Sequence, residues 1–406
     1  MIEPKLRFKA DDGSQFPDWE EKTLGDIGTA KMCKRVLKEQ TSEKGDVPFY
    51  KIGTFGGTPD AFISRELYEE LKTKYSFPRK GNILLSAAGT IGRTVVYDGQ
   101  DAFFQDSNIV WLDNDDSVLD GFLLQFYNKT SWNNLEGGTI KRLYNGLFLS
   151  KVIHVPSIPE QQKIVEFLST IDTVIEKQKE TVSAWEERKK GVMQKLFGQE
   201  VRFKADDGSE FPEWEEKSYL SICNVFADGD WIESKDQSDS GIRLIQTGNI
   251  GNGVFIDKDD KKKYISKETF DRLKCNEVFE GDILISRLPS PAGRACIVPK
   301  LNERMITAVD CTIVRTDKSI ILHDYCVQFM QSSKHFYYVA SMMAGGTRQR
   351  ISRKNLEDEL ISVPCLEEQQ KIADCLSSLD EVIENQKATL AAWEELKKGL
   401  LQQMFV

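Results

Sequence analysis

Two long segments of this chain each occur twice, and any fold must accommodate both copies. RFKADDGSQFPDWEEK at residues 7–22 returns as RFKADDGSEFPEWEEK at residues 202–217, an offset of 195 residues. We call these two segments the FPxW strips. A second segment, which begins PEQQKI and ends near AWEERKKG at residues 159–194, returns at residues 367–402, an offset of 208 residues. Because the repeated segments flank inserts of different length and sequence, they indicate one scaffold that presents two different recognition surfaces.

The second repeat predicts two long helices, over residues 159–200 and 364–406. Apolar residues recur in both copies at alternating spacings of four and three, which is a heptad seam and favours left-handed coiled-coil packing. Ser157 and Glu160 stand at capping-box spacing before the first helix. The seam positions are Ile164, Leu168, Ile171, Ile175, Gln178, Val182 and Trp185 in the first copy, and Ile372, Leu376, Leu379, Ile383, Gln386, Leu390 and Trp393 in the second.

Two near-identical seams in one chain most simply bind each other. We predict antiparallel pairing, which places Gln178 near Leu390 and Gln386 near Val182, whereas parallel pairing would stack Trp on Trp and Lys on Lys. Polar residues at seam positions weaken the seam but fix its register. The alternative is that each helix packs only on its own domain. At about 1.5 Å per residue such a helix spans roughly 55 Å and is long enough to act as a spacer.

The inserts, within residues 1–158 and 201–363, are predicted to be two related domains of a mixed α/β (α+β) class. GNILLSAAGTIGR at residues 81–93 parallels GDILISRLPSPAGR at residues 281–294, and QDSNIVW parallels VDCTIVR. These short β-branched runs, bounded by Gly, Asp and Asn, are typical of strands and turns. SRELYEELK and SKETFDRLK are predicted to be short helices.

Composition narrows the class of function. The chain is 40% apolar, has no run near the roughly 20 apolar residues that cross a bilayer, and begins without a secretory signal, so we expect a cytoplasmic protein. Eight cysteines without CxxC spacing and only three histidines predict neither disulfides nor a metal site. The net charge of −10 argues against nonspecific nucleic-acid binding, but clustered basic residues can still bind DNA specifically.

One basic loop recurs near the end of each insert, as GGTIKRLYNGLF and GGTRQRISRKNL. Arg, Lys and Gln are the side chains that reach base edges and phosphates. A single such loop is as easily an ordinary solvated turn, but recurrence in two diverged domains favours DNA contact. The candidate DNA-binding residues, including those of other polar turns, are Lys51, Thr54, Ser86, Thr90, Arg93, Thr139, Lys141, Arg142, Gln246, Thr247, Asn249, Arg287, Arg294, Thr347, Arg348, Gln349, Arg350 and Arg353.

Catalytic motifs are not found. The sequence has no P-loop ending in GK[ST], no GxG loop after a predicted strand and no Asn/Asp-Pro-Pro-aromatic motif. Asp60 followed by Glu70 and Lys72 imitates a metal-dependent nuclease, in which such residues hold Mg²⁺ from adjacent strands. Here Glu70 and Lys72 fall in a predicted helix, so we predict neither a catalytic residue nor a metal ligand in this chain.

The order of FPxW strip, insert and EQQKI…ID…QK…W.E.KKG helix, repeated once, resembles the specificity (S) subunit of type I restriction-modification systems over essentially the whole chain. The resemblance implies two target-recognition domains, each reading half of a split, asymmetric site on double-stranded DNA. It implies that the helices pair antiparallel as a ruler between half-sites. It also implies docking of two methyltransferase subunits that bring S-adenosylmethionine, and of restriction subunits that use ATP and Mg²⁺ for host defence.

Three alternatives remain open from the sequence. The chain is the recognition subunit of a related fused restriction-methyltransferase system, a nuclease that acts through Asp60, Glu70 and Lys72, or a coiled-coil scaffold without DNA binding. Mg²⁺-dependent cleavage by the purified chain would favour the nuclease. Unchanged DNA binding of the assembled complex after charge reversal at Arg348 and Arg350 would favour the scaffold.

Overall fold

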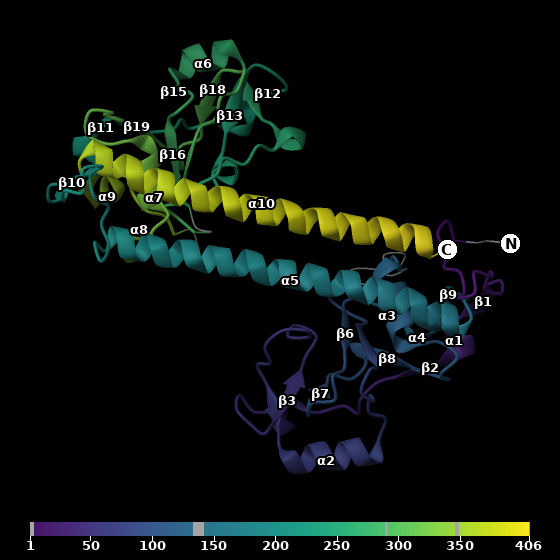
Figure 1. Ribbon diagram of the computed structural model, residues 1–406. Coiled ribbons are helices and arrows are strands. Elements are labelled where there is room, and N and C mark those ends of the chain that lie inside the picture. The colour runs from purple at the N-terminus through teal and green to yellow at the C-terminus, as the bar shows by residue number, and fades with distance from the viewer. Residues whose placement is uncertain (1–3, 133–141, 289–290, 346–348, 406) are drawn as a thin grey trace. The chain divides into compact units, whose positions relative to one another are not determined.

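The computed structural model describes residues 4–132, 142–288, 291–345 and 349–405. The chain divides into two compact units. Unit 1 contains Met1–Lys179 and Ala388–Val406, and unit 2 contains Glu180–Lys387. The two helices predicted from the seams are present as α5 (Ile158–Phe197) and α10 (Leu366–Met404). Each long helix therefore contributes one half to each unit (Figure 1).

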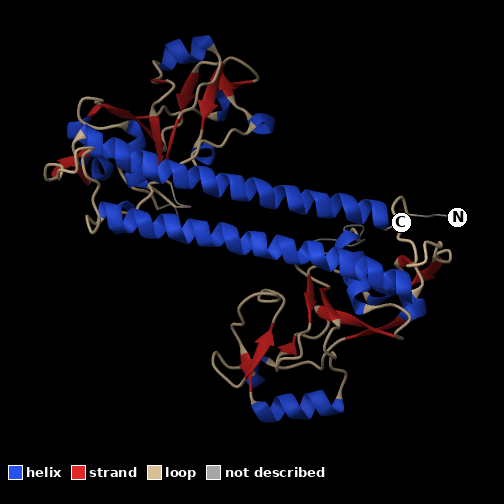
Figure 2. Ribbon diagram, in the orientation of Figure 1, coloured by secondary structure: helices blue, strands red, loops and turns tan. Residues whose placement is uncertain are grey.

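Unit 1 is a mixed α/β domain built on three small sheets, whose strands are the arrows of Figure 2. An antiparallel pair joins β1 (Glu20–Thr23) to β9 (Val152–Val155). A four-stranded sheet has the order β2 (Gly28–Lys31), β8 (Ile109–Asn114), β5 (Ile83–Ser86), β6 (Thr94–Val96). A three-stranded sheet has the order β4 (Phe62–Ile63), β3 (Val47–Tyr50), β7 (Phe103–Phe104). The helices are α1 (Leu24–Ile27), η1 (Lys38–Gln40), α2 (Arg65–Lys74), α3 (Asp120–Lys129) and α4 (Asn145–Leu149).

Unit 2 repeats this plan. An antiparallel pair joins β10 (Glu215–Ser218) to β20 (Leu360–Val363). The four-stranded sheet has the order β11 (Cys223–Asp228), β19 (Cys311–Thr316), β16 (Ile283–Ser286), β17 (Ala295–Ile297). The third sheet has the order β12 (Gln237–Ser238), β14 (Tyr264–Ile265), β13 (Ile242–Ile245), β18 (Met305–Thr307), β15 (Glu277–Val278). The helices are η2 (Tyr219–Ile222), η3 (Ser234–Asp236), η4 (Thr247–Asn249), η5 (Asp259–Lys261), α6 (Lys267–Leu273), α7 (His323–Met330), α8 (Ser333–Ser341) and α9 (Arg353–Asp358).

The sheet registers establish that the two inserts are related domains. β5 and β8 pair antiparallel with Ser86 opposite Ile109, and β16 and β19 pair antiparallel with Ser286 opposite Cys311. In both units one strand pair of the third sheet is parallel, β3 with β7 and β13 with β18. The predicted mixed α/β class with two pseudo-repeated domains is confirmed, and the helices predicted from SRELYEELK and SKETFDRLK are α2 and α6.

In unit 1 the start of α5 packs against the end of α10. Ile164, Leu168 and Ile171 are buried in the same core cluster as Leu401 and Met404. Because the residues of α5 lie early in that helix and those of α10 lie late, the two half-helices are antiparallel. Two ion pairs follow the same direction, from Asp172 to Lys397 and from Lys179 to Glu394, the latter at 3.9 Å.

Unit 2 contains the other two half-helices in the same arrangement, with the end of α5 against the start of α10. Met193 and Leu196 share a core cluster with Ile372 and Leu376. Glu186 pairs with Lys387 at 3.0 Å and Lys189 with Asp380 at 2.6 Å. The half-helices of each unit lie side by side in Figure 1, and the predicted antiparallel pairing is confirmed.

The seam residues separate into two levels of burial. All but two of the aliphatic seam positions are buried, whereas the glutamines, the tryptophans, Leu379 and Leu390 are half-buried. The buried set is Ile164, Leu168, Ile171, Ile175, Val182, Ile372, Leu376 and Ile383. The half-buried set is Gln178, Trp185, Leu379, Gln386, Leu390 and Trp393.

Candidate nucleic-acid interface

Each FPxW strip is bound to the first turn of the long helix that follows its domain. In unit 1, Arg7 donates through Nε and Nη2 to the two carboxylate oxygens of Glu160, at 3.0 and 2.9 Å. Trp19 Nε1 donates to the same carboxylate at 3.1 Å. Glu160 is completely buried, so its charge is compensated by these donors. The predicted capping box is therefore wrong, because Glu160 binds the strip and the buried Ser157 hydroxyl has no hydrogen-bond partner among the described residues.

Unit 2 contains the same contact. Arg202 donates to Glu368 at 3.1 and 2.8 Å, and Trp214 Nε1 donates to it at 2.9 Å. The following glutamines, Gln161 and Gln369, bind the domains instead, since each accepts from one backbone amide at 2.8 Å and donates to two carbonyl oxygens. The two repeated segments are thus repeated together because they contact each other and hold the variable domain between them.

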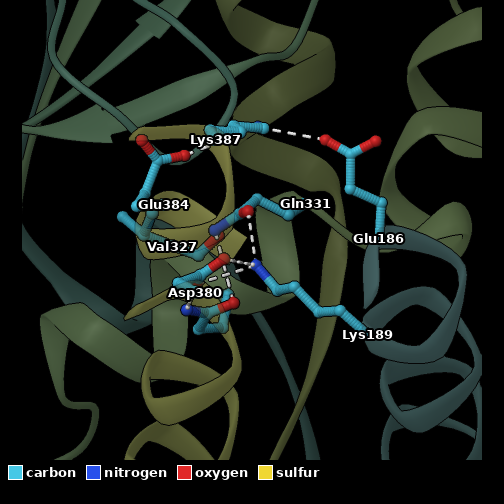
Figure 3. A network of polar contacts seen from close by, with 8 residues as sticks. Glu186, Lys189, Val327, Gln331, Asp380, Glu384 and Lys387 are labelled. Atoms are coloured by element: carbon cyan, nitrogen blue, oxygen red, sulfur yellow. Dashed lines mark hydrogen bonds and ion pairs between the residues drawn. The ribbon is translucent and has the colours of Figure 1, made fainter. Parts of the chain in front are cut away.

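A second polar attachment joins the paired helices to each domain. In unit 2, Lys189 donates to both carboxylate oxygens of Asp380, at 2.6 and 2.8 Å, and Gln328 of α7 donates to the same carboxylate at 2.8 Å. Figure 3 shows Lys189 reaching from α5 toward Asp380 and Gln331, whose Oε1 accepts at 2.9 Å. The equivalent centre of unit 1 is Asp172, which pairs with Lys397 and accepts from Gln125 Nε2 of α3 at 3.0 Å.

In unit 1 the predicted DNA contacts come together from three segments. Arg93, after the β5–β6 loop, donates through Nη1 to the carbonyl of Phe55 at 2.8 Å, which ties that loop to the turn containing Lys51 and Thr54. The amide of Leu143 donates to the carbonyl of Ala87 at 2.9 Å, so the third segment joins the same loop. Arg142 donates through Nη2 to the carbonyl of Ser107 at 2.6 Å.

Within this cluster the predicted residues divide into internal and outward-facing side chains. Ser86 is buried and fixes the loop, because its hydroxyl donates to the Thr90 carbonyl at 2.5 Å and accepts from the Arg93 amide at 2.8 Å. Thr90 and Arg93 are exposed, and Lys51 forms an ion pair with Asp60 at 2.8 Å. The Thr54 hydroxyl bonds the backbone of Lys51. Thr139 and Lys141 lie outside the described residues.

Unit 2 brings the equivalent segments together through Arg294. Its guanidinium donates to the carbonyls of Thr247 at 2.8 Å and Ile250 at 2.6 Å, and burial lowers its pKa. Asn249 is buried and closes the same turn, since its Oδ1 accepts from the Gln246 amide at 3.0 Å. Thr247 and Gln246 themselves are half-buried at the surface of the turn.

The remaining predicted residues of unit 2 lie around Arg287. This arginine is buried, donates to the carbonyl of Val309 and lies 3.5 Å from Asp228. Its own carbonyl accepts from the amide of Ile351 at 3.2 Å, which brings the basic loop to the β16–β17 loop. Beside it, the exposed Arg350 lies 3.7 Å from Asp310, Gln349 is exposed, and Arg353 pairs with Glu357 at 3.1 Å. Thr347 and Arg348 lie outside the described residues.

Sequence reasoning missed the residues that hold this interface in place. Glu160 and Glu368 were hidden because their partners lie 153 and 166 residues away in the chain. Asp172 and Asp380 were missed because they stand beside the seam and not on it. The available signal was that each of these four acidic residues is the same in both copies of the helix repeat, as are the arginine and tryptophan of the strips that bind the two glutamates.

In the structure, the three residues that imitate a nuclease form hydrogen bonds and ion pairs with neighbouring side chains. Glu70 accepts from Lys74 at 2.9 Å on α2, Lys72 donates to the Tyr68 hydroxyl at 2.9 Å, and Asp60 pairs with Lys51. Within the described ranges, no group of three or more His, Cys, Asp or Glu side chains is placed to hold a metal ion. None of the described helices is long and apolar enough to cross a membrane.

Two related α/β domains, each attached to an antiparallel pair of half-helices and each with converging basic loops, define a protein with two separate recognition surfaces. The family model for the type I restriction modification DNA specificity domain matches residues 17–183 and 212–394. The chain belongs to this family. It is a non-catalytic DNA specificity subunit of a type I restriction-modification system, with two target-recognition domains.

Relatives and solved structures agree with this assignment. A type I restriction enzyme specificity subunit from Methanocaldococcus jannaschii is 22% identical over 413 residues, covering 97% of this chain and 94% of the relative. A relative from Haemophilus influenzae, named for a type I restriction enzyme specificity subunit, is 56% identical over 152 residues, which is 37% of this chain and 40% of the relative. The crystal structure of an S subunit from M. genitalium aligns with a TM-score of 0.55 at 16% identity, covering 100% of this chain and 99% of that one, and so shares the fold.

Proposed function

We propose that each unit reads one half of a bipartite, asymmetric DNA sequence. The observation that carries this proposal is that the same three segments converge in both units while the side chains they present differ. Lys51, Thr54 and Thr90 occupy the cluster of unit 1, and Gln246, Thr247 and Arg350 that of unit 2. Because base edges are distinguished by hydrogen-bond pattern, different side chains on equivalent loops read different sequences.

We further propose that residues 1–158 and 201–363 act as the two readers, and that helices 159–200 and 364–406 act as the spacers that set the distance between half-sites. Two domains that contact the same face of B-DNA must be separated by about one helical turn, roughly 34 Å, or by a multiple of it. The attachments at the buried Glu160 and Glu368 and at the half-buried Asp172 and Asp380 support this role, because they couple each domain to its helices.

In the cell this chain would act in the cytoplasm on double-stranded DNA, in complex with other subunits. Two methyltransferase subunits, docked on the helices and domains, would bind S-adenosylmethionine and methylate adenine. Restriction subunits would use ATP and Mg²⁺ to translocate and cleave unmodified DNA. One solved structure with the same fold (TM-score 0.52, 15% identity, covering 96% of this chain and 97% of that one) comes from work on complex assembly of a type I system.

The test is a domain exchange read by methylation. This chain is expressed with its methyltransferase subunits in a host without adenine methylation, and the methylated motif is determined by sequencing. Residues 23–158 are then replaced by the equivalent segment of another specificity subunit. We expect one half of the motif to change and the other half and the spacer length to stay the same. A change in both halves would overturn the proposal of independent readers.

A further inference from the structure

The two units differ at a turn beside the predicted DNA contacts. Eleven residues (51–61) join β3 to β4 in unit 1, whereas eighteen residues (246–263) join β13 to β14 in unit 2. The longer connection contains the sequence DKDDKKK at residues 257–263. Unit 2 therefore contains a charged segment that the shorter connection of unit 1 has no room for.

The extra segment is fixed by Asp257, which binds β13, and by the preceding Ile256, whose backbone bonds the η4 turn. Asp257 binds the buried Arg243, which also pairs with Glu303 at 2.8 Å. The amide and carbonyl of Ile256 bond the carbonyl and side-chain amide of Asn249, at 2.8 and 2.9 Å. The segment is thus held in place by Asp257 and Ile256, while Lys258, Lys261 and Lys263 remain exposed at the surface.

These lysines and the η4 turn enclose a pocket of about 300 Å³, lined by Gln246, Thr247 and the side chains of Lys258, Lys261, Lys262 and Lys263. Lys258 Nζ lies over the turn so closely that a Cβ atom added at Gly248 would come within 2.6 Å of it. The other side of the turn is held by Arg294, whose guanidinium donates to the Thr247 carbonyl.

The charge of this pocket is positive. Lys262 is neutralised by Asp259 at 2.8 Å and lies 3.5 Å from Glu303. Lys258, Lys261 and Lys263 are exposed, and no acidic group of the described residues forms an ion pair with them. Asp260 is the remaining exposed carboxylate of the segment. Three free ammonium groups therefore face the same side as the turn.

We propose that Lys258, Lys261 and Lys263 form a DNA phosphate-binding site of unit 2, which anchors the backbone next to the bases read by the turn at residues 246–249. Lysine is a flexible point charge suited to phosphate, and phosphate contacts fix position without reading sequence. This inference rests on the proposed function and deepens it. Unit 2 would thus bind the DNA backbone of its half-site through lysine–phosphate attraction that the shorter β3–β4 connection of unit 1 does not provide.

The experiment compares the wild-type complex with K258Q/K261Q/K263Q, each assembled with the methyltransferase subunits. Affinity is measured over a salt series for a duplex with the methylated motif and for one with the unit 2 half-site scrambled. We expect the slope of log K against log salt to become shallower by about 2 to 3, since each phosphate contact contributes about 0.9. Affinity should fall roughly a hundredfold for both duplexes at about 0.15 M salt, with their ratio preserved.

A matched control removes the same charge away from the pocket, as K235Q/K267Q/K318Q, three exposed lysines of unit 2 that do not line it. We expect this control to keep the wild-type salt slope. An unchanged slope in K258Q/K261Q/K263Q would overturn the phosphate site while leaving the proposed function intact. A loss confined to the intact motif would also overturn it, because that result identifies base contacts. Absence of any motif preference in the wild-type complex would instead refute the proposed function.

Discussion

At the start of each long helix, one completely buried glutamate binds an arginine and a tryptophan from an FPxW strip. In unit 2 the hydrogen bonds to Glu368 raise the pKa of the Arg202 guanidinium. Removal of one partner from a buried pair leaves the other charge uncompensated, which is more costly than loss of the contact itself.

We therefore expect Glu368→Ala to lower the free energy of unfolding by about 3–5 kcal/mol, as measured by urea unfolding of the full chain. Glu213 provides a matched control, because it lies 3.9 Å from the same Arg202 but is almost fully exposed. Glu213→Ala should change the free energy of unfolding by less than about 0.5 kcal/mol. Equal effects of the two substitutions would show that burial of Glu368 contributes nothing.

A buried histidine holds the β16–β17 loop of unit 2. His335 Nδ1 lies 2.9 and 2.8 Å from the carboxylate oxygens of Glu359, and Nε2 lies 2.9 Å from the carbonyl oxygen of Gly293. Since a carbonyl oxygen can only accept, Nε2 donates to Gly293, and Nδ1 lies at the Glu359 carboxylate. Burial raises the pKa of Glu359, and the hydrogen bond from His335 opposes that rise.

Substitution of His335 by Ala should consequently destabilise the protein more at high pH than at low pH. Without its donor, Glu359 has a folded-state pKa still further above the unfolded value of about 4.3. Its protonated form then stabilises the fold below that value, and this contribution is lost as pH rises, by up to about 1.4 kcal/mol per pH unit. Urea midpoints at about pH 5 and about pH 8 measure the difference. His323→Ala, at a more exposed histidine, should show no such trend, and a pH-independent penalty in His335→Ala would contradict the prediction.

At the scale of elements, the two halves of each helix pair are joined to a domain through one aspartate. In unit 2, Asp380 of α10 binds Lys189 of α5 and Gln328 of α7. Lys189 is 7% exposed, so its ammonium group depends on these partners for compensation. One carboxylate thus sets the register between the two helices and the position of α7 on them.

We expect Asp380→Ala to destabilise the full chain by about 2–4 kcal/mol, because among the described residues it leaves the buried Lys189 with the Gln331 oxygen as its acceptor. Asp374 lies on the same helix, is exposed, and its carboxylate accepts from the neighbouring Gln370, so Asp374→Ala should be nearly neutral. Urea unfolding monitored by tryptophan fluorescence compares the two variants. A neutral Asp380→Ala would mean that the apolar seam alone determines the register.

The long helices, their antiparallel pairing and the main strands were predictable because their signals are local or repeated. Heptad spacing identifies a helix and its seam, and β-branched runs between glycines identify strands such as β5 and β16. Glu160 was misassigned to a capping box because its true partner, Arg7, lies 153 residues away. Arg287 and Arg294 were chosen by residue type, which does not reveal that their guanidinium groups donate to the protein's own carbonyls.

At the scale of the whole molecule, unit 1 contains a contact between Leu6 and Gln403 whose counterpart in unit 2 lies within one continuous segment of the chain. In unit 1 the amide of Leu6 donates to the carbonyl of Gln403 at 3.0 Å. In unit 2 the amide of Val201 donates to the carbonyl of Lys195 at 3.3 Å, within an unbroken chain. Leu6 and Val201 stand at the same place before their FPxW strips, and Lys195 and Gln403 at the same place in the helix repeat.

The aromatic contacts around these ends match as well. Phe405 packs on Trp19 and Phe122 in unit 1, with ring centroids 6.5 and 5.0 Å apart. Phe197 packs on Tyr325 in unit 2 at 5.8 Å, and Tyr325 packs on Trp214 at 6.4 Å. The end of α10 therefore meets the first strip as the end of α5 meets the second, although only the latter pair is covalently joined.

The order of strip, insert and helix is therefore the same whether it is followed from residue 5 or from residue 200. A permuted chain that joins Phe405 to Lys5 through Gly-Gln, and opens between Gln199 and Glu200, should fold and direct methylation to the unchanged motif. Opening within α5, between Glu176 and Lys177, should abolish methylation, because it severs a paired helix. Methylome sequencing distinguishes the two, and an inactive first permutant would mean that covalent continuity at residue 200 is essential. A chain with this repeated order can therefore start at either strip and still present the same two domains to DNA.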